Sequence, residues 1–400
     1  MMNEECGKPA EDLGRTSPVP PSVSPGTAPG NTRARQSADL ANLDFLRAVA
    51  VGLVLVGHLC ATMRIRGAGD LGHFGVLLFF VHTALVLMMS MERLGMAGWN
   101  LYKAFVIRRL FRIYPLSILS VCFVVCFRVP SIPWSGSYEW VGWPVFVSNA
   151  LLTQNLTQSS SVICVLWSLP FEIQMYAILP LLFMLILRFP SPRATVGVWS
   201  VAVGVAAAEY IARPAGFNAD FLLARYFPCF VAGVFAWRLM SNVRARRLPG
   251  WAWMTFLLFL VVAYRLVSFL RAWGPSAWGT DLLNDWLFCA AVGLAVPHFL
   301  EIRNRCLKSI SSQIARYSYG IYVSHIPILW LCFVRFQIAS GILSAALAVL
   351  LTALTSVLLY HSLEDPAIRV GKRFAGGPPL HPTRASRPEC TEPAVATPRA

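Results

Sequence analysis

Apolar stretches of about 18 or more residues recur along most of this chain, and they restrict its fold more than any other feature. The first, "LDFLRAVAVGLVLVGHLC", runs from Leu43 to Cys60. The chain is 56% hydrophobic and 13% charged, whereas a soluble domain is about 45–50% apolar and about 25% charged. The sequence therefore predicts an integral membrane protein with many spans, and excludes a soluble body with a single anchor.

The apolar pattern predicts an all-α fold, a polytopic bundle of about ten transmembrane helices. We expect these helices near residues 44–63, 72–91, 106–127, 168–188, 194–212, 221–239, 251–270, 283–300, 314–334 and 339–361. A further stretch, "VGWPVFVSNALLTQNL" over 141–156, is apolar but short, and fits either a span or a re-entrant piece.

Basic residues gather in every second gap between the expected helices. Because short cytoplasmic loops accumulate Lys and Arg, this pattern predicts that both termini are cytoplasmic. The net charge of +15 is spread among these gaps, so we attribute it to topology and anionic headgroups, and we expect no nucleic-acid partner. The excess of Arg over Lys is typical of a GC-rich genome and favours a multi-pass protein of the bacterial plasma or inner membrane.

The two ends of the chain differ in composition from its middle. Residues 1–42 and 374–400 are rich in Pro, Ser, Thr and Gly, and such segments bury too little surface to fold alone. We expect a disordered cytoplasmic leader, a membrane domain over 43–373 and a disordered tail. The ten cysteines form no paired CxxC units, so we expect no metal site.

Arg47 and His58 lie on one face of the first expected helix, because eleven steps of about 100° return to within about 20° of the same direction. A charge at the bilayer centre costs at least about 2.5–3.5 kcal/mol. A histidine there can accept a proton from a hydroxyl. We favour this catalytic role over a hydrogen bond that only packs helices.

A cluster of arginines precedes Pro115 in "VIRRLFRIYPL", at the expected cytoplasmic end of the third helix. Arg108 and Arg112 are one turn apart, so they can face one anion. With Arg109, they could hold the phosphates of a cytosolic donor. Taken alone, such a cluster more often marks the cytoplasmic side.

Ser168, Glu172 and Tyr176 follow one another at four-residue steps in "WSLPFEIQMYAILPLL" and form one polar line on an apolar helix. Glu172 has no basic neighbour in sequence, so its partner must come from another helix. Arg47 or His58 can supply it. A structural pair between helices explains this carboxylate nearly as well as a catalytic role.

Tyr322 and His325 face one side of the ninth expected helix, with Tyr319 one turn before. The signal is weak, because tyrosine is common at membrane interfaces. Two further patterns are discarded. "GAGDLG" from Gly67 has no preceding strand, as a nucleotide-binding loop requires, and "HSLED" at His361 has the wrong spacing for an HxxxxD acyltransferase.

Taken together, these stretches resemble the acyltransferase 3 family of polytopic membrane O-acyltransferases. The family's opening motif is similar to "LDFLRAVAVGLVLVGH", with a histidine eleven residues after an arginine. The later motifs, in matching order over about residues 43–373, are "GVLLFFVHTALVLMMS" from Gly75, "RRLFRIYPL" from Arg108, "WSLPFEIQMYAILPLL" from Trp167, "YSYGIYVSHIPIL" from Tyr317 and "EDPAIR" from Glu364.

The resemblance implies that an acyl group, commonly acetyl, passes from acyl-CoA at the cytoplasm to a hydroxyl of a sugar or a polyketide-like natural product. Acyl-CoA is then a donor substrate, with no bound cofactor and no metal. His58 would be the base, Arg47 its structural or donor-binding partner, and Glu172 the buried acid. Arg108, Arg109 and Arg112 would bind the donor. The residues expected to support the pocket are Asp44, Trp167, Ser168, Tyr176, Tyr319, Tyr322 and His325.

The chain departs from the family pattern at several positions. Phe45 and Ala48 replace glycines, Leu77 replaces a common aspartate, and Thr83 and Ala84 follow His82 where the family has Ser-Gly. The lost acid and the added histidine change the acceptor side of the pocket. We see no C-terminal extension for the esterase-like domain of some relatives, so transfer to a periplasmic acceptor would need the bundle itself or a separate partner protein.

Two other functions compete with acyl transfer. In a transporter or flippase, Arg47, His58 and Glu172 would form an ion or proton path. The sequence shows no pair of broken helices in matching halves, which such proteins often have. A non-catalytic scaffold would tolerate the loss of both His58 and Glu172.

Overall fold

The computed structural model describes residues 40–65, 69–134, 137–189, 191–212, 222–242, 248–272, 279–337 and 340–376. Within these ranges the regular elements are helices joined by turns and loops, and no strand is formed, which confirms the all-α bundle. Most of the predicted leader and nearly all of the predicted tail lie outside the described residues, so their disorder stays a prediction.

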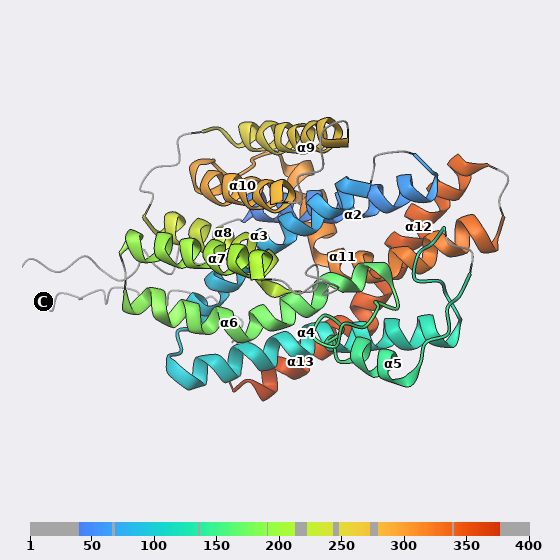
Figure 1. Ribbon diagram of the computed structural model, residues 1–400, viewed down its shortest axis with the longest axis horizontal. Helices are drawn as coiled ribbons and strands as arrows, with labels where there is room; N and C mark the ends of the chain where they lie inside the picture. Colours follow the sequence, from blue (N-terminus) through green and yellow to red (C-terminus); the bar gives the residue numbers. More distant parts are fainter. Residues whose placement is uncertain are drawn as a thin grey trace, which may run out of the picture. The chain divides into compact units, whose positions relative to one another are not determined.

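Ten long helices occupy the ten predicted positions (Figure 1). They are α2 (Ala41–Thr62), α3 (Gly69–Leu94), α4 (Gly98–Cys126), α6 (Leu169–Arg188), α7 (Pro192–Ala212), α8 (Leu223–Asn242), α9 (Gly250–Ala272), α10 (Gly279–Ala295), α11 (Arg305–Trp330) and α12 (Gly341–Leu359). Among the described residues, eight helices are long and apolar enough to cross a membrane; α8 and α10 are not among them. The count of about ten spans and the cytoplasmic termini stay predictions.

Shorter elements complete the bundle. They are α5 (Trp143–Ala150), the 3-10 helices η1 (Cys164–Ser168) and η3 (Val296–His298), the π-helical segments η4 (Leu331–Arg335) and η5 (Tyr360–Glu364), and α13 (Asp365–Phe374). The eight residues of α5 extend only about 12 Å at 1.5 Å per residue. This is far less than the thickness of the hydrocarbon core, roughly 30 Å. The helix within the 141–156 stretch is therefore too short to span the membrane.

Helix α3 lies at the centre of the bundle and packs against α2, α6, α8, α9 and α10 (Figure 1). In its most apolar window 78% of residues are buried, compared with 33% for α2. Two glycines allow the close packing. A Cβ on Gly75 would lie 2.6 Å from the Ala50 carbonyl, and one on Gly233 would lie 2.2 Å from the Val81 carbonyl.

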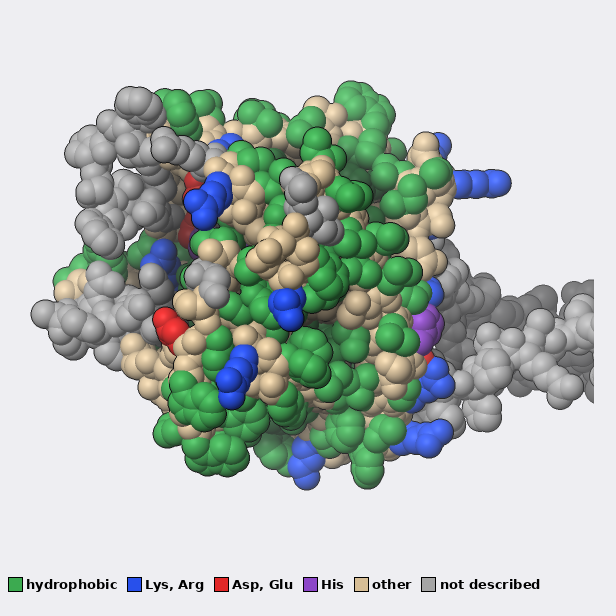
Figure 2. Space-filling model, turned by 90° about the vertical axis from the view of Figure 1, so that its right-hand side faces the viewer, with side chains coloured by type: hydrophobic (Ala, Val, Ile, Leu, Met, Phe, Trp, Pro, Cys, Tyr) green, Lys and Arg blue, Asp and Glu red, His purple; other side chains and the backbone are tan. Residues whose placement is uncertain are grey.

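The lipid-facing sides of the outer helices are apolar. Large exposed side chains on α9 include Leu258 and Phe259, each 64% exposed, and on α12 Leu358, 66% exposed. Because the helices satisfy their backbone groups internally, such sides suit a hydrocarbon environment. Figure 2 shows a different face, the end of the bundle at the right of Figure 1, where hydrophobic side chains mix with polar ones and with Lys and Arg.

Helix α2 begins at Ala41, two residues before the predicted domain boundary. The reason is Asn42, which is buried and binds the segment before α11. Its backbone N–H donates to Glu301 Oε2 at 2.8 Å, its Nδ2 donates to the Leu300 carbonyl at 3.0 Å, and its Oδ1 accepts from the Ile302 N–H at 3.1 Å. This polar residue therefore belongs to the fold and not to a leader.

Candidate active site

A cavity lies between α2, α3, α4, α6 and α11, with about 680 Å³ of empty space that includes open solvent at its mouth. Its lining is unusually polar for the inside of a membrane bundle. The polar lining residues are Arg47, His82, Thr83, Arg109, Arg112, Ser168, Glu172, Tyr176, Ser318, Tyr319 and Tyr322.

Three arginines from two helices face this cavity. Arg47 on α2 donates from Nε to Ser318 Oγ at 2.6 Å, and the hydroxyl of Ser318 donates in turn to a helix carbonyl. Arg109 on α4 donates to Ser90 Oγ at 3.2 Å. Because guanidinium groups are fixed by such contacts, their remaining donors are held ready for an anion.

The arginine that shares the cavity with Arg112 is Arg109, and not Arg108 as the one-turn spacing had suggested. The part of the cavity wall that α4 supplies consists of Arg109, Arg112 and Ile113, and the last two lie three and four positions after the first. Arg108 turns away from this stripe, and its Nε is buried without a hydrogen bond from the described residues. Spacing alone could not separate the two, since steps of three and four both stay on one side of a helix.

The predicted polar line on α6 faces the cavity along its length. The Tyr176 hydroxyl donates to Glu172 Oε2 at 3.1 Å. Glu172 also interacts electrostatically with Arg47 and with the two cavity arginines of α4. Arg47, one of the two predicted partners, therefore shares the cavity with this carboxylate, and His58, the other, does not line it.

The tyrosines of α11 form the far wall of the cavity. Tyr322 and Ser168 share a hydrogen bond of 2.6 Å between their hydroxyls, and Tyr322 also donates to the Val165 carbonyl at 2.7 Å. Tyr319 donates to the Ile113 carbonyl at 2.8 Å. These bonds fix the wall to η1 and to α4.

His58 lies behind this wall, in contact with His325. The distance from His325 Nε2 to His58 Nδ1 is 3.4 Å, and the ring of His325 lies 6.2 Å from that of Tyr322. The Nδ1 atoms of both histidines also face helix carbonyls, at 2.9 Å from Val54 and 3.0 Å from Ile321. With both rings neutral, these carbonyls place the protons on Nδ1, which leaves Nε2 of His58 as a free base.

Three predicted supporting residues, Asp44, Trp167 and His325, lie outside the cavity lining. Asp44 is half-buried in the first turn of α2. Trp167 stacks against His73, with ring centroids 6.0 Å apart and planes inclined by 10°. Its neighbour Ser168 does line the cavity.

His82 and Glu364 were not among the predicted site residues, but the first lines the cavity and the second contacts one of its arginines. His82 is only 3% exposed and lines the cavity, and its Nδ1 has no hydrogen bond from the described residues. Glu364 lies 3.4 Å from Arg112. The departure from the family pattern at His82 could have indicated a site residue, because an isolated imidazole in an apolar helix needs a partner or a ligand.

A helical membrane domain with arginines, a carboxylate and an imidazole around one internal cavity defines a polytopic membrane protein that handles a polar or anionic ligand within the bilayer. The chain belongs to the acyltransferase 3 family, since the family model, described as an acyltransferase domain, matches residues 40–361. It is therefore a multi-pass membrane acyltransferase, as the sequence motifs predicted. No curated protein and no solved structure matches the chain significantly.

Proposed function

We propose that this protein transfers an acyl group, most simply acetyl, from acyl-CoA to a hydroxyl of a carbohydrate or polyketide-like acceptor. One observation carries the proposal: three arginines and a carboxylate line one cavity inside an acyltransferase domain. Coenzyme A is polyanionic, and its thioester carbonyl gains negative charge when it is attacked. Arginine suits both, because it forms charge-assisted bonds to phosphate and to a developing oxyanion.

The donor would reach the cavity from the end of α4 that we predict to be cytoplasmic. Arg109 and Arg112 lie nearest that end of the lining, and Arg47 faces them from α2. In this arrangement the α4 arginines hold the anionic part of the donor. The remaining donors of Arg47 are free to stabilise the carbonyl oxygen.

His58 would accept the proton of the acceptor hydroxyl as that oxygen attacks the thioester carbon. The C–S bond breaks, the ester forms, and the thiolate of CoA leaves and takes up a proton. The Val54 carbonyl supports this role by accepting from Nδ1–H of His58, which keeps Nε2 available, and His325 packs against the same nitrogen at 3.4 Å. Because His58 does not line the cavity that holds the arginines, the reaction at His58 requires side chains between them to move when the donor binds.

His82 is the rival base, because it already lines the cavity. The test compares His58→Gln with His82→Gln in purified protein in nanodiscs, with acetyl-CoA as donor and methyl glycosides as acceptors. His298→Gln, at an exposed position, is the matched control. We expect His58→Gln to slow transfer by about 10²–10⁴-fold, as for the loss of a general base, and the other two to stay within a few-fold. If His58→Gln keeps wild-type activity, His58 is not the base.

The same preparation separates acyl transfer from transport. Acceptor-dependent release of CoA, with an acetylated product seen by mass spectrometry, supports the proposal. Movement of solute across vesicles without consumption of acetyl-CoA supports a transporter in which Arg47 and Glu172 form an ion path. Comparison of surface glycans and secreted metabolites from cells with and without the protein would identify the natural acceptor, the cell membrane in which it acts, and any separate periplasmic partner.

A further inference from the structure

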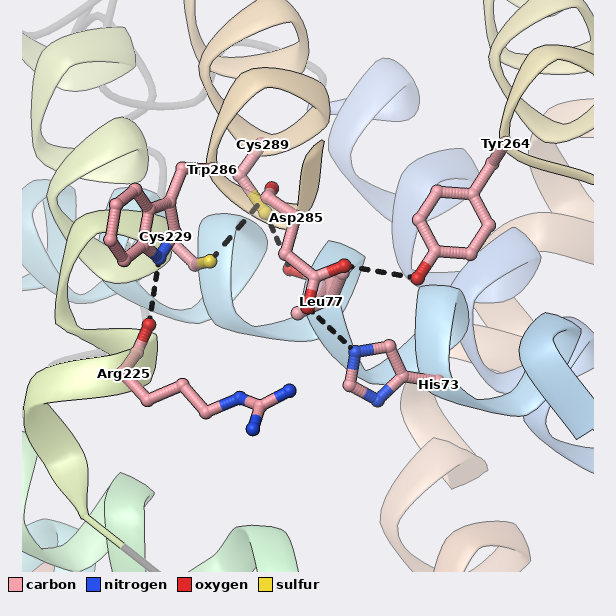
Figure 3. Close-up of polar contacts among 8 residues, drawn as sticks. All are labelled: His73, Leu77, Arg225, Cys229, Tyr264, Asp285, Trp286 and Cys289. Carbon is pink, nitrogen blue, oxygen red and sulfur yellow. Dashed lines mark hydrogen bonds and ion pairs between the residues drawn. The ribbon is translucent and has the colours of Figure 1, made fainter. Parts of the chain in front are cut away.

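A second polar cluster joins α3 to α9 and α10, and none of its side chains lines the arginine cavity (Figure 3). His73 Nε2 lies 2.9 Å from Asp285 Oδ2, and the Tyr264 hydroxyl donates to Asp285 Oδ1 at 3.0 Å. His73 comes from α3, Asp285 from α10 and Tyr264 from α9. Asp285 is 4% exposed, so its charge is stabilised only because these partners surround it.

The pair of His73 and Asp285 has the arrangement of a carboxylate–imidazole dyad. Since Asp285 receives Nε2–H, the other ring nitrogen, Nδ1, remains for a further partner, and the described residues give it no hydrogen bond. The His73 side chain is 29% exposed. A carboxylate in this position fixes the tautomer and the orientation of the ring, so Nδ1 is a directed polar group on an accessible side chain.

The dyad is adjacent to both parts of the proposed active site. Gly72, which precedes His73, packs against His58. A Cβ on Gly72 would lie 3.5 Å from His58 Cε1. Trp167 stacks on His73, and the next residue, Ser168, lines the arginine cavity. The dyad and His58 therefore flank the same turn of α3.

Charged side chains lie near the dyad at the beginning of α3. Asp70, three residues before His73, forms an ion pair of 3.1 Å with Arg265 on α9. The Asp70 side chain is 49% exposed and the Arg265 side chain is 30% exposed. The Arg225 guanidinium lies beside the dyad (Figure 3). A ligand that arrives here meets charges of both signs, which favours a group that both donates and accepts hydrogen bonds.

We propose that the dyad of His73 and Asp285 binds the acceptor hydroxyl, on the side of His58 opposite to the donor arginines. A hydroxyl fits because it donates to a neutral Nδ1 and accepts from a protonated one. The ligand class is a polyhydroxylated molecule such as a sugar. This inference rests on the proposed function, and it gives separate binding sites to donor and acceptor.

The test measures methyl glycoside binding directly, by equilibrium dialysis on the intact protein in nanodiscs, and then the KM values of both substrates. His73→Gln and Asp285→Asn should weaken glycoside binding and raise the acceptor KM at least about tenfold, as for one lost hydrogen bond to a charged pair. The KM for acetyl-CoA and its acceptor-independent hydrolysis should not change. Trp286→Phe is the matched control, because it alters the neighbouring position on α10, including the bond from this indole to the Arg225 carbonyl, and leaves both members of the dyad in place.

A double variant guards against a purely structural effect. His73→Leu with Asp285→Leu replaces the pair by apolar groups, which membrane and core packing tolerate. If this variant folds and keeps the wild-type acceptor KM, the inference is wrong, and it is equally wrong if wild-type protein binds no glycoside. Glycoside binding without any acyl transfer would contradict the proposed function but would still support a glycoside-binding site at the dyad.

Discussion

The carboxylate of Glu364 lies 3.4 Å from the guanidinium of Arg112, and its side chain is fully buried. Glu364 is the last residue of the π-helical segment η5, which joins α12 to α13. Single π-helical turns often occur at functional sites. Here the widened turn directs an acid from the C-terminal end of the bundle toward an arginine of the cavity, so α13 and the donor side of the site are coupled.

Breaking this pair should destabilise the protein strongly. Glu364→Ala leaves Arg112 without its carboxylate partner, and the loss of one member of a buried pair costs about 3 kcal/mol or more. Asp365→Ala is the control, because its partner Arg369 is 67% exposed and such a pair contributes under about 1 kcal/mol. Thermal unfolding in nanodiscs measures both. Equal midpoints would show that the Glu364 pair is not part of the stable fold.

Packing at the centre of the bundle predicts a sharp difference between two glycines. An alanine at Gly233 would place its Cβ 2.2 Å from the Val81 carbonyl, whereas nothing lies within 4 Å of a Cβ at Gly204. Overpacking against backbone costs about 1–3 kcal/mol or more. Gly233→Ala should therefore lower the unfolding midpoint by several degrees and Gly204→Ala should not. The same midpoint for both variants would contradict the α3–α8 contact.

Asn42→Ala tests the beginning of the domain. The variant removes the acceptor of the Ile302 N–H and the donor to the Leu300 carbonyl, at a cost of about 1–3 kcal/mol. We expect faster hydrogen exchange at the Ile302 amide. Asn304→Ala is the comparison, since this side chain caps α11 at the Leu307 N–H and should affect that amide only. Unchanged exchange at Ile302 in Asn42→Ala would place residue 42 outside the folded domain.

The helices could be predicted because long apolar stretches have few alternatives inside a bilayer. All ten predicted segments overlap helices of the structure, and Glu172, Tyr176 and Arg112 lie on two helices that line the same cavity. The helical step also placed Ser168 on the same face as Glu172, because this depends only on neighbours within one element. Predictions of this kind need no knowledge of how helices pack.

Lateral packing could not be predicted from one sequence. The spacing put Arg47 and His58 on one stripe, but Arg47 lines the cavity and His58 does not, and His58 instead contacts His325 of α11. The same limit explains the choice of Arg109 over Arg108. His73 and Asp285 are 212 positions apart, and no local pattern indicates such a pair.

The most direct test of the donor site compares three neighbouring arginines. Acetyl-CoA binding is measured by equilibrium dialysis for Arg108→Gln, Arg109→Gln and Arg112→Gln in nanodiscs, with thermal unfolding as the check of folding. The cavity predicts that Arg109→Gln and Arg112→Gln each weaken binding by about tenfold or more, as for the loss of a charged hydrogen bond, while Arg108→Gln stays within about twofold. An equal loss in all three folded variants, or no loss in any, would contradict the assignment of this cavity to acyl-CoA.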